Sequence, residues 1–182
     1  MSAALNCNIC FIGGGNMAQA LIGGLIARGL PATRITVSDP VEQVRQLLQE
    51  KDVQVTEDNV AAIQTADVVV FAVKPQVLAQ VLKPLNGLFA GKLVISIVAG
   101  AEISTISKLL GTDQVVRVMP NTPALVQTGA HGLYATDAVA EKDRNLASQV
   151  LAATGLTIWV NTEAQIDAVT AVSGSGPAYF FY

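Results

Sequence analysis

Residues 8–24 constrain the fold of this chain more than any other segment. A short apolar run ends at Ile12, glycines follow at positions 13 and 15, and Ala18 then opens an apolar pattern with helical spacing. A strand, a tight turn and a helix N-terminus in this order hold the pyrophosphate of a dinucleotide. The free N–H groups and the positive dipole end of that helix favour the anion.

Each small residue of this turn has a separate expected role. Gly13 permits the tight turn, Gly15 lacks a Cβ so that backbone N–H groups can approach the phosphates, and Ala18 lets the helix pack on the strand. Two alternatives are a glycine-rich turn without a ligand and a membrane helix over residues 9–27. Polar residues and several glycines interrupt that apolar stretch, which disfavours the second alternative.

Composition agrees with a chain whose strands are buried on both faces, as in parallel α/β proteins: 51% of residues are hydrophobic and 14% are charged. A length of 182 residues suits one full domain with a small addition. The net charge of −3 argues against a nucleic-acid partner. No basic leader precedes the first strand, so we expect a cytoplasmic protein without a membrane partner.

Two cysteines, Cys7 and Cys10, lie at the first predicted strand with a spacing that occurs in redox pairs and metal half-sites. The sequence has no second pair, and a strand does not bring these two side chains together. We therefore predict structural thiols and no metal site.

Strand-like and helix-like segments alternate along the rest of the chain. This alternation predicts an α/β fold with a doubly wound, Rossmann-like and mainly parallel sheet. The expected strands are 8–12, 35–38, 53–55, 67–73, 93–98, 115–119, 132–136 and 156–160, and the expected helices are 16–29, 40–51, 58–64, one from residue 75, 104–110 and 140–153.

The end of the second strand normally selects the cofactor. An acidic residue about 20 positions after the glycines usually binds the ribose 2′-hydroxyl of NAD. Asp39 stands there, but it precedes Pro40, and Asp with Pro is a common helix start, so we expect Asp39 to be an N-cap. Ser38 would then lie nearest the ribose and donate to a 2′-phosphate. This favours NADP over NAD, although no arginine is obviously placed to clamp the phosphate.

Four further segments lie at strand ends or resemble binding loops, where open α/β sheets hold ligands. Residues 72–75 end the fourth strand, with Lys74 held extended by the proline that follows it. Residues 96–100 are small enough to admit a flat ring, residues 119–123 form a rigid loop with two prolines, and residues 173–179 combine serines and glycines. The alternative for Lys74 is a solvated surface lysine, and the alternative for residues 173–179 is a plain helix-capping loop. The lone histidine, His131, is interpreted as a structural loop residue.

Together these segments resemble pyrroline-5-carboxylate reductases over residues 9–182. The resemblance rests on Phe-Ile-Gly-x-Gly-Asn-Met in the first turn, Ala-Val-Lys-Pro at 72–75, Met-Pro-Asn-Thr-Pro-Ala at 119–124, and Ile-Asp-Ala-Val-Thr followed by Val-Ser-Gly-Ser-Gly-Pro-Ala-Tyr at 166–179. It implies reduction of the small molecule 1-pyrroline-5-carboxylate to L-proline, by hydride transfer from NADPH or NADH to a cyclic imine.

The resemblance also implies which residues line the site. Catalytic residues are unknown, because the family's carboxylate-binding loop belongs to a helical domain after residue 182. The expected cofactor contacts are Ile12, Gly13, Gly14, Gly15, Asn16, Met17, Ser38, Asn59, Ala72, Val73, Lys74 and Pro75. The expected substrate-pocket residues are Met119, Asn121, Thr122, Ser173, Gly174, Ser175 and Gly176.

The same resemblance divides the chain in two. We expect residues 1–161 to form a Rossmann dinucleotide-binding domain, and residues 162–182 to form a connector and the start of a helical dimerisation domain that is otherwise absent. The full-length protein would then be a homo-oligomer. Two alternatives stay open, another NADP-dependent oxidoreductase acting on a hydroxyacid and a non-catalytic dinucleotide-binding module.

Overall fold

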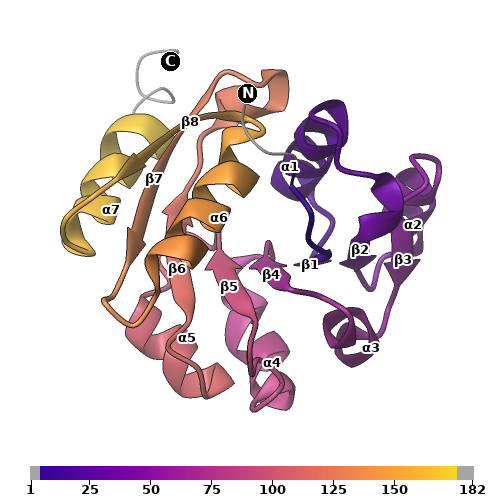
Figure 1. Ribbon diagram of the computed structural model, residues 1–182, viewed down its shortest axis with the longest axis horizontal. Coiled ribbons are helices and arrows are strands. Elements are labelled where there is room, and N and C mark those ends of the chain that lie inside the picture. The colour runs from indigo at the N-terminus through magenta and orange to yellow at the C-terminus, as the bar shows by residue number, and fades with distance from the viewer. Residues whose placement is uncertain (1–4, 176–182) are drawn as a thin grey trace.

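A computed structural model of the protein describes residues 5–175, in which one sheet is covered by helices on both faces (Figure 1). The strand order is β3-β2-β1-β4-β5-β6-β7-β8. Strands β1 to β6 are parallel, β7 is antiparallel to β6, and β8 is parallel to β7. This confirms the doubly wound, mainly parallel α/β sheet. The strands are β1 Ile9–Ile12, β2 Ile35–Ser38, β3 Gln54–Thr56, β4 Val68–Phe71, β5 Leu93–Ser96, β6 Val115–Met119, β7 Gly129–Ala135 and β8 Gly155–Trp159.

Alternate residues of the central strands enter two separate cores. Ile9 and Phe11 of β1 pack with α1, α2 and α6, whereas Cys10 and Ile12 pack with α3, α4 and α5. The helices are α1 Asn16–Ala27, α2 Glu42–Gln49, α3 Asn59–Gln64, α4 Leu78–Leu82, α5 Ile103–Leu110, α6 Glu141–Ala152 and α7 Ala164–Val169.

The two cysteines are buried free thiols that belong to different cores, Cys7 to that of α1 and Cys10 to that of α4. Burial raises the pKa of Cys7 to about 11 and that of Cys10 to about 12. A thiol held protonated is a poor nucleophile and a poor metal ligand. The buried positions of Cys7 and Cys10 therefore suit a role in core packing.

Several predicted boundaries differ from the structure. Helix α2 begins at Glu42, two residues after Pro40, and Pro75 starts a 3-10 turn, Pro75–Val77, before α4. Strand β7 begins at Gly129, so His131 lies within a strand and not in a loop. The glycines there look like turn signals in the sequence, but they allow close pairing: a Cβ on Gly155 would overlap the Gly129 carbonyl.

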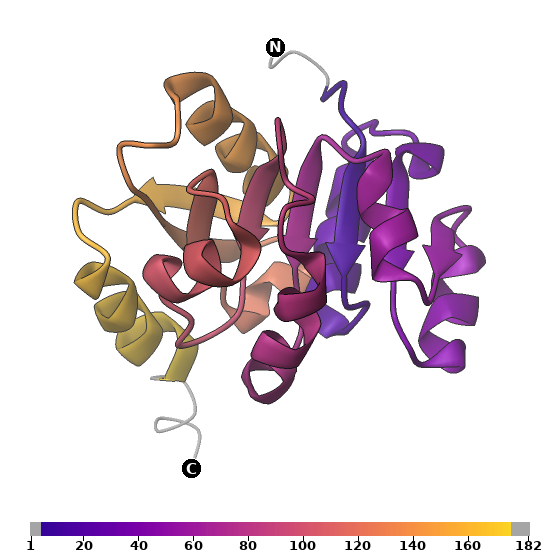
Figure 2. The ribbon, with the colours of Figure 1, turned by 90° about the horizontal axis from the view of Figure 1, so that it is seen from below.

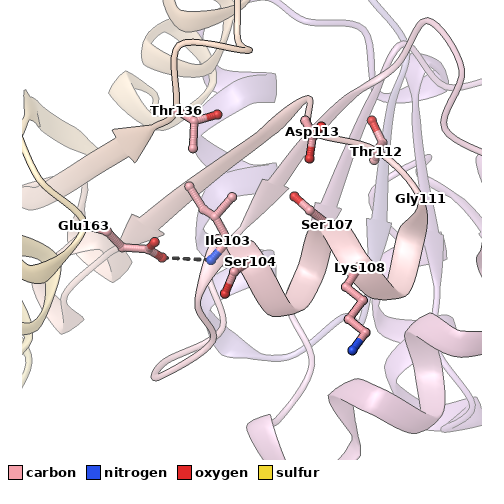
Figure 3. A pocket seen from close by; sticks show the side chains of 9 residues that line it. All are labelled: Ile103, Ser104, Ser107, Lys108, Gly111, Thr112, Asp113, Thr136 and Glu163. Carbon is pink, nitrogen blue, oxygen red and sulfur yellow. Dashed lines mark hydrogen bonds between the residues drawn. The ribbon is translucent and has the colours of Figure 1, made fainter.

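Helix α7 was not predicted as a separate element, and a buried arginine fixes it to the sheet. Arg117 of β6 is 3% exposed, and its guanidinium donates to Glu163 Oε1 at 3.1 Å and to Asp167 Oδ1 at 2.8 Å. The Glu163 carboxylate also accepts from the backbone N–H of Ile103, at the start of α5, at 2.8 Å (Figure 3). Figures 1 and 2 both place α7 beside the part of the sheet that holds β7. The division into domains at residue 161 remains a prediction.

We predict unequal roles for the two carboxylates that pair with Arg117. Glu163→Ala removes the acceptor shared by Arg117 and Ile103, and should lower the free energy of unfolding by about 2–3 kcal/mol, because it leaves a buried cation poorly paired. Asp167 is 70% exposed, so Asp167→Asn should cost less than about 1 kcal/mol. Urea unfolding of both variants checks this, and equal losses would contradict it.

Candidate dinucleotide site

The turn after β1 is held by contacts with two neighbouring strands. Gly13 has φ +99°, a conformation that favours glycine. Its N–H donates to the carbonyl of Ser38 at 2.8 Å, and a Cβ at this position would lie 2.7 Å from the carbonyl oxygen of Ala72. The ends of β1, β2 and β4 therefore converge on a residue that has to be glycine.

Asp39 joins this turn to the loop that follows β2. Its Oδ2 accepts from the N–H of Gly14 at 2.8 Å, and its Oδ1 accepts from the N–H of Val41 at 2.8 Å. The expected N-cap role is wrong, because Val41 is the N-cap of α2 and Pro40 precedes the helix. One carboxylate oxygen bonds to the glycine turn and the other to the loop before α2, so both oxygens already accept hydrogen bonds.

The turn is closely packed on one side and open on the other. A Cβ on Gly14 would lie 2.6 Å from Val44 Cγ1, whereas a Cβ on Gly15 would meet nothing within 4 Å. Gly15 is the N-cap of α1, and no side chain caps the first N–H groups of that helix, which begins with Asn16 and Met17. The open side thus presents unpaired donors to a space that an anion fits.

Gln19 also supports this turn, and no sequence pattern had indicated it. Its Nε2 donates to the carbonyl oxygen of Gly14 at 2.7 Å. The sequence signal that could have identified Gln19 is its position, because it is a polar residue one helical turn after Gly15.

Ser38 and Asn59, both expected cofactor contacts, are brought together at the end of β2. The buried Ser38 hydroxyl donates to Asn59 Oδ1 at 2.7 Å. The hydroxyl proton is therefore directed at Asn59, and the Asn59 amide NH₂ group is left for another acceptor. In this geometry Ser38 orients Asn59, and direct donation from Ser38 to a cofactor is not favoured.

The segment after β4 lies beside the glycine turn. The N–H of Ala72 donates to the carbonyl of Ile12 at 2.9 Å, and Val73 Cγ1 lies 3.2 Å from the Cβ position of Gly13. Lys74 is extended, with φ −67° and ψ 144°, as the following Pro75 predicts, and both residues are exposed. This backbone therefore borders the same open edge.

The expected substrate residues form a second cluster. Asn121 Nδ2 donates to Ser173 Oγ at 2.9 Å, and Asn121 Oδ1 accepts from the N–H of Ala130 at 2.9 Å. A Cβ on Gly174 would lie 2.7 Å from Met119 Cε. Ser173 and Gly174 belong to a π-helical turn, Thr170–Ser175, that continues α7.

The remaining candidates for the substrate pocket are Thr122, Ser175 and Gly176. Thr122 is exposed and opens a 3-10 helix, Thr122–Val126, where a loop was expected, and this helix contacts α1. The substrate cluster therefore lies next to the helix that follows the glycine turn. The side chain of Ser175 and all of Gly176 lie outside the described residues.

A separate hollow of about 630 Å³ lies along α5, lined by residues that include Ser104, Ser107, Lys108 and Thr136 (Figure 3). It shares no lining residue with the glycine turn or the substrate cluster. Within residues 5–175 no three His, Cys, Asp or Glu side chains gather as a metal site would require. No helix in this range has the length and apolar character to cross a membrane.

Together, the strand order, the glycine turn and the open edge above β1 and β4 define a Rossmann-type dinucleotide-binding domain. Residues 8–100 match the family described as NADP oxidoreductase, coenzyme F420-dependent, which places the domain among the oxidoreductases. A pyrroline-5-carboxylate reductase of Haemophilus influenzae is 50% identical over 95% of this chain and 65% of its own length. The chain belongs to the pyrroline-5-carboxylate reductase family.

Solved structures agree with this assignment. A pyrroline-5-carboxylate reductase from Coxiella burnetii superposes with a TM-score of 0.92 and 44% identity, over 97% of this chain and 67% of that one. A Plasmodium falciparum pyrroline carboxylate reductase with NADP bound superposes with a TM-score of 0.85 and 28% identity, over 97% of this chain and 65% of that one. The chain thus spans about two thirds of the length of such relatives.

His131 supports the fold and not the site. It is buried in β7; the Thr154 hydroxyl donates to the Leu151 carbonyl at 3.2 Å, so the imidazole Nε2–H donates to the Thr154 oxygen at 3.0 Å. Burial lowers the pKa of His131 below its usual 6.5. The structural role expected from the sequence fits this environment.

We predict an acid-sensitive stability that depends on His131. The unfolded chain takes up the proton first, so this contribution is complete above about pH 6.5 and is lost as the pH falls toward the folded pKa. His131 is the only histidine, so His131→Gln should remove most of the slope of unfolding free energy between about pH 5.5 and 6.5. Urea unfolding across this range measures it, and an unchanged slope in the variant would contradict the assignment.

Proposed function

We propose that this chain forms the cofactor-binding part of a reductase that converts 1-pyrroline-5-carboxylate to L-proline with NADPH, the last step of proline biosynthesis. The observation that carries the proposal is the Asn121–Ser173 hydrogen bond beside the helix of the glycine turn. It joins two segments whose motifs are shared with the family and which lie 52 positions apart. The relatives named above supply the substrate.

NADP is the proposed cofactor, with NADH as the alternative donor. The family description and the NADP-bound Plasmodium relative support this choice. In this chain the packed Gly13 and Gly14, the open space at Gly15 and the free N–H groups of α1 fit a pyrophosphate. Ala72 and Val73 would border the same cofactor.

The cofactor, when bound, would supply a hydride to the imine carbon. The residues of this chain would then bind and orient the reactants. Asn121, held by Ala130 and Ser173, would keep the substrate ring beside the cofactor edge. A protonated C=N bond is already electrophilic, so the absence of a histidine or carboxylate group from the described cluster is compatible with the reaction.

A hydroxyacid dehydrogenase and a non-catalytic binding module are the other candidates. The assay uses the full-length protein, follows NADPH oxidation with 1-pyrroline-5-carboxylate and identifies L-proline by mass spectrometry. Activity on hydroxyacids alone would support the first alternative, and binding of NADPH without any turnover would support the second. Homo-oligomerisation and a cytoplasmic location remain predictions.

Replacement of Gly15 should separate cofactor binding from folding. A valine there would block the open side of the turn, so Gly15→Val should weaken NADPH binding at least about 100-fold. Gly23→Val is the matched control, because a Cβ at Gly23 of α1 also meets nothing within 4 Å. Fluorescence titration measures both affinities, and near-native binding by Gly15→Val would overturn the pyrophosphate assignment.

Asn121→Ala should affect the substrate and spare the cofactor. Loss of the amide releases Ser173 and the backbone of Ala130, and should raise the KM of the full-length protein for 1-pyrroline-5-carboxylate by about tenfold. The Kd for NADPH should stay within about twofold, because the glycine turn is untouched. Equal losses for substrate and cofactor would show that Asn121 supports the whole fold.

A further inference from the structure

Two acid-rich loops lie side by side where β2 and β3 end. The strands are parallel, with Ser38 paired to Thr56, and the N–H of Asp39 donates to the Thr56 carbonyl at 3.1 Å. The first loop leads into α2, and the second contains Glu57 and leads into α3. In the dinucleotide fold, the cofactor ribose lies at the end of the second strand. These loops therefore border the place where NADP and NAD differ.

Arg45 reaches this edge from α2. Its Nη1 donates to the carbonyl of Asp39 at 2.8 Å, and its Nη2 lies 3.6 Å from Glu57 Oε2. The Arg45 side chain is 20% exposed and that of Glu57 is 75% exposed. Arg45 is also the only lysine or arginine between positions 39 and 50.

The Arg45 guanidinium is held in place, but most of its N–H donors make no hydrogen bond within the described residues. It carries five N–H donors, and within residues 5–175 one of them makes a hydrogen bond, to a neutral carbonyl. The contact with Glu57 is long and solvated, and such pairs contribute about 0–1 kcal/mol. A phosphate accepts bidentate, charge-assisted hydrogen bonds from arginine and would compete well with this carboxylate.

The neighbouring carboxylates differ in the number of hydrogen bonds that they already accept. Asp39 accepts from Gly14 and Val41, Asp58 accepts from two N–H groups at the start of α3, and Glu42 pairs with Gln46. Among the described residues, the Glu57 side chain forms an ion pair with Arg45 and no other ion pair or hydrogen bond. It is therefore the carboxylate that can move away when an anion arrives.

We propose that Arg45 binds the 2′-phosphate of the cofactor and that Glu57 competes with this phosphate for the guanidinium, so that the pair sets the preference for NADPH over NADH. This inference rests on the proposed cofactor function. Without Arg45, the acidic side chains of the two loops would repel a 2′-phosphate. Asn59, whose amide NH₂ group is left free by Ser38, lies beside the same strand end as a second donor.

The test compares the affinities of three variants for NADPH and NADH by fluorescence titration. Arg45→Gln should raise the Kd for NADPH at least about tenfold, as the loss of a charge-assisted hydrogen bond implies, and change that for NADH less than about twofold. Glu57→Gln should tighten NADPH about two- to fivefold and leave NADH unchanged. Arg34→Gln is the matched charge control, because Arg34 precedes β2 at its opposite end.

The outcomes separate this inference from the proposed function. If the unmodified chain binds neither cofactor, the proposed function fails and the inference fails with it. If both cofactors bind but Arg45→Gln weakens them equally, or weakens neither, the inference alone is overturned. Should Arg45→Gln lower the melting temperature strongly, Glu57→Gln decides: unchanged NADPH affinity in that exposed variant overturns the competition between carboxylate and phosphate.

Discussion

The close approach of three strand ends at Gly13 is the constraint on which the rest of the site depends. Its N–H is bonded to the end of β2, and its Cβ position is filled by the backbone after β4. A side chain there would push β1 away from β4 and move the start of α1. Because α1 also contacts the 3-10 helix Thr122–Val126, such a shift would reach the substrate cluster. One backbone position therefore sets the spacing between the cofactor turn and the substrate residues.

The centre of the sheet could be predicted from the sequence because its central strands are buried on both faces. Val68–Phe71 and Leu93–Ser96 read as short apolar runs, and both runs are strands that lie wholly in the core. Strand β7 was harder, since its glycines resemble a loop when the neighbouring β8 is unknown. Helix α7 was expected only as part of a connector and helical start over residues 162–182, and its bounds were not predicted because an interaction with Arg117, 46 and 50 positions away, fixes it. Interactions of that range leave no local pattern.

In the candidate site, too, local motifs could be predicted from the sequence and long-range interactions could not. The glycine turn and the segment 72–75 are local motifs, and the structure places them together as expected. The role of Asp39 was misjudged, because an Asp-Pro pair predicts a cap, whereas the carboxylate bonds backward to Gly14 across 25 positions. Arg45 was overlooked for a related reason. Its proximity to Glu57 depends on where α2 starts and on the pairing of β2 with β3, and neither is visible in the residues around it.

Strand β6 links folding to substrate placement. Arg117 in this strand anchors α7, and Met119 at its end opens the loop that carries Asn121. The π-helical turn that continues α7 brings Ser173 back to Asn121. Glu163, Arg117, Asn121 and Ser173 thus form a closed path from the sheet to α7 and back. A residue such as Glu163, outside both clusters, consequently helps determine where the Ser173 hydroxyl lies, because the orientation of α7 carries that hydroxyl with it.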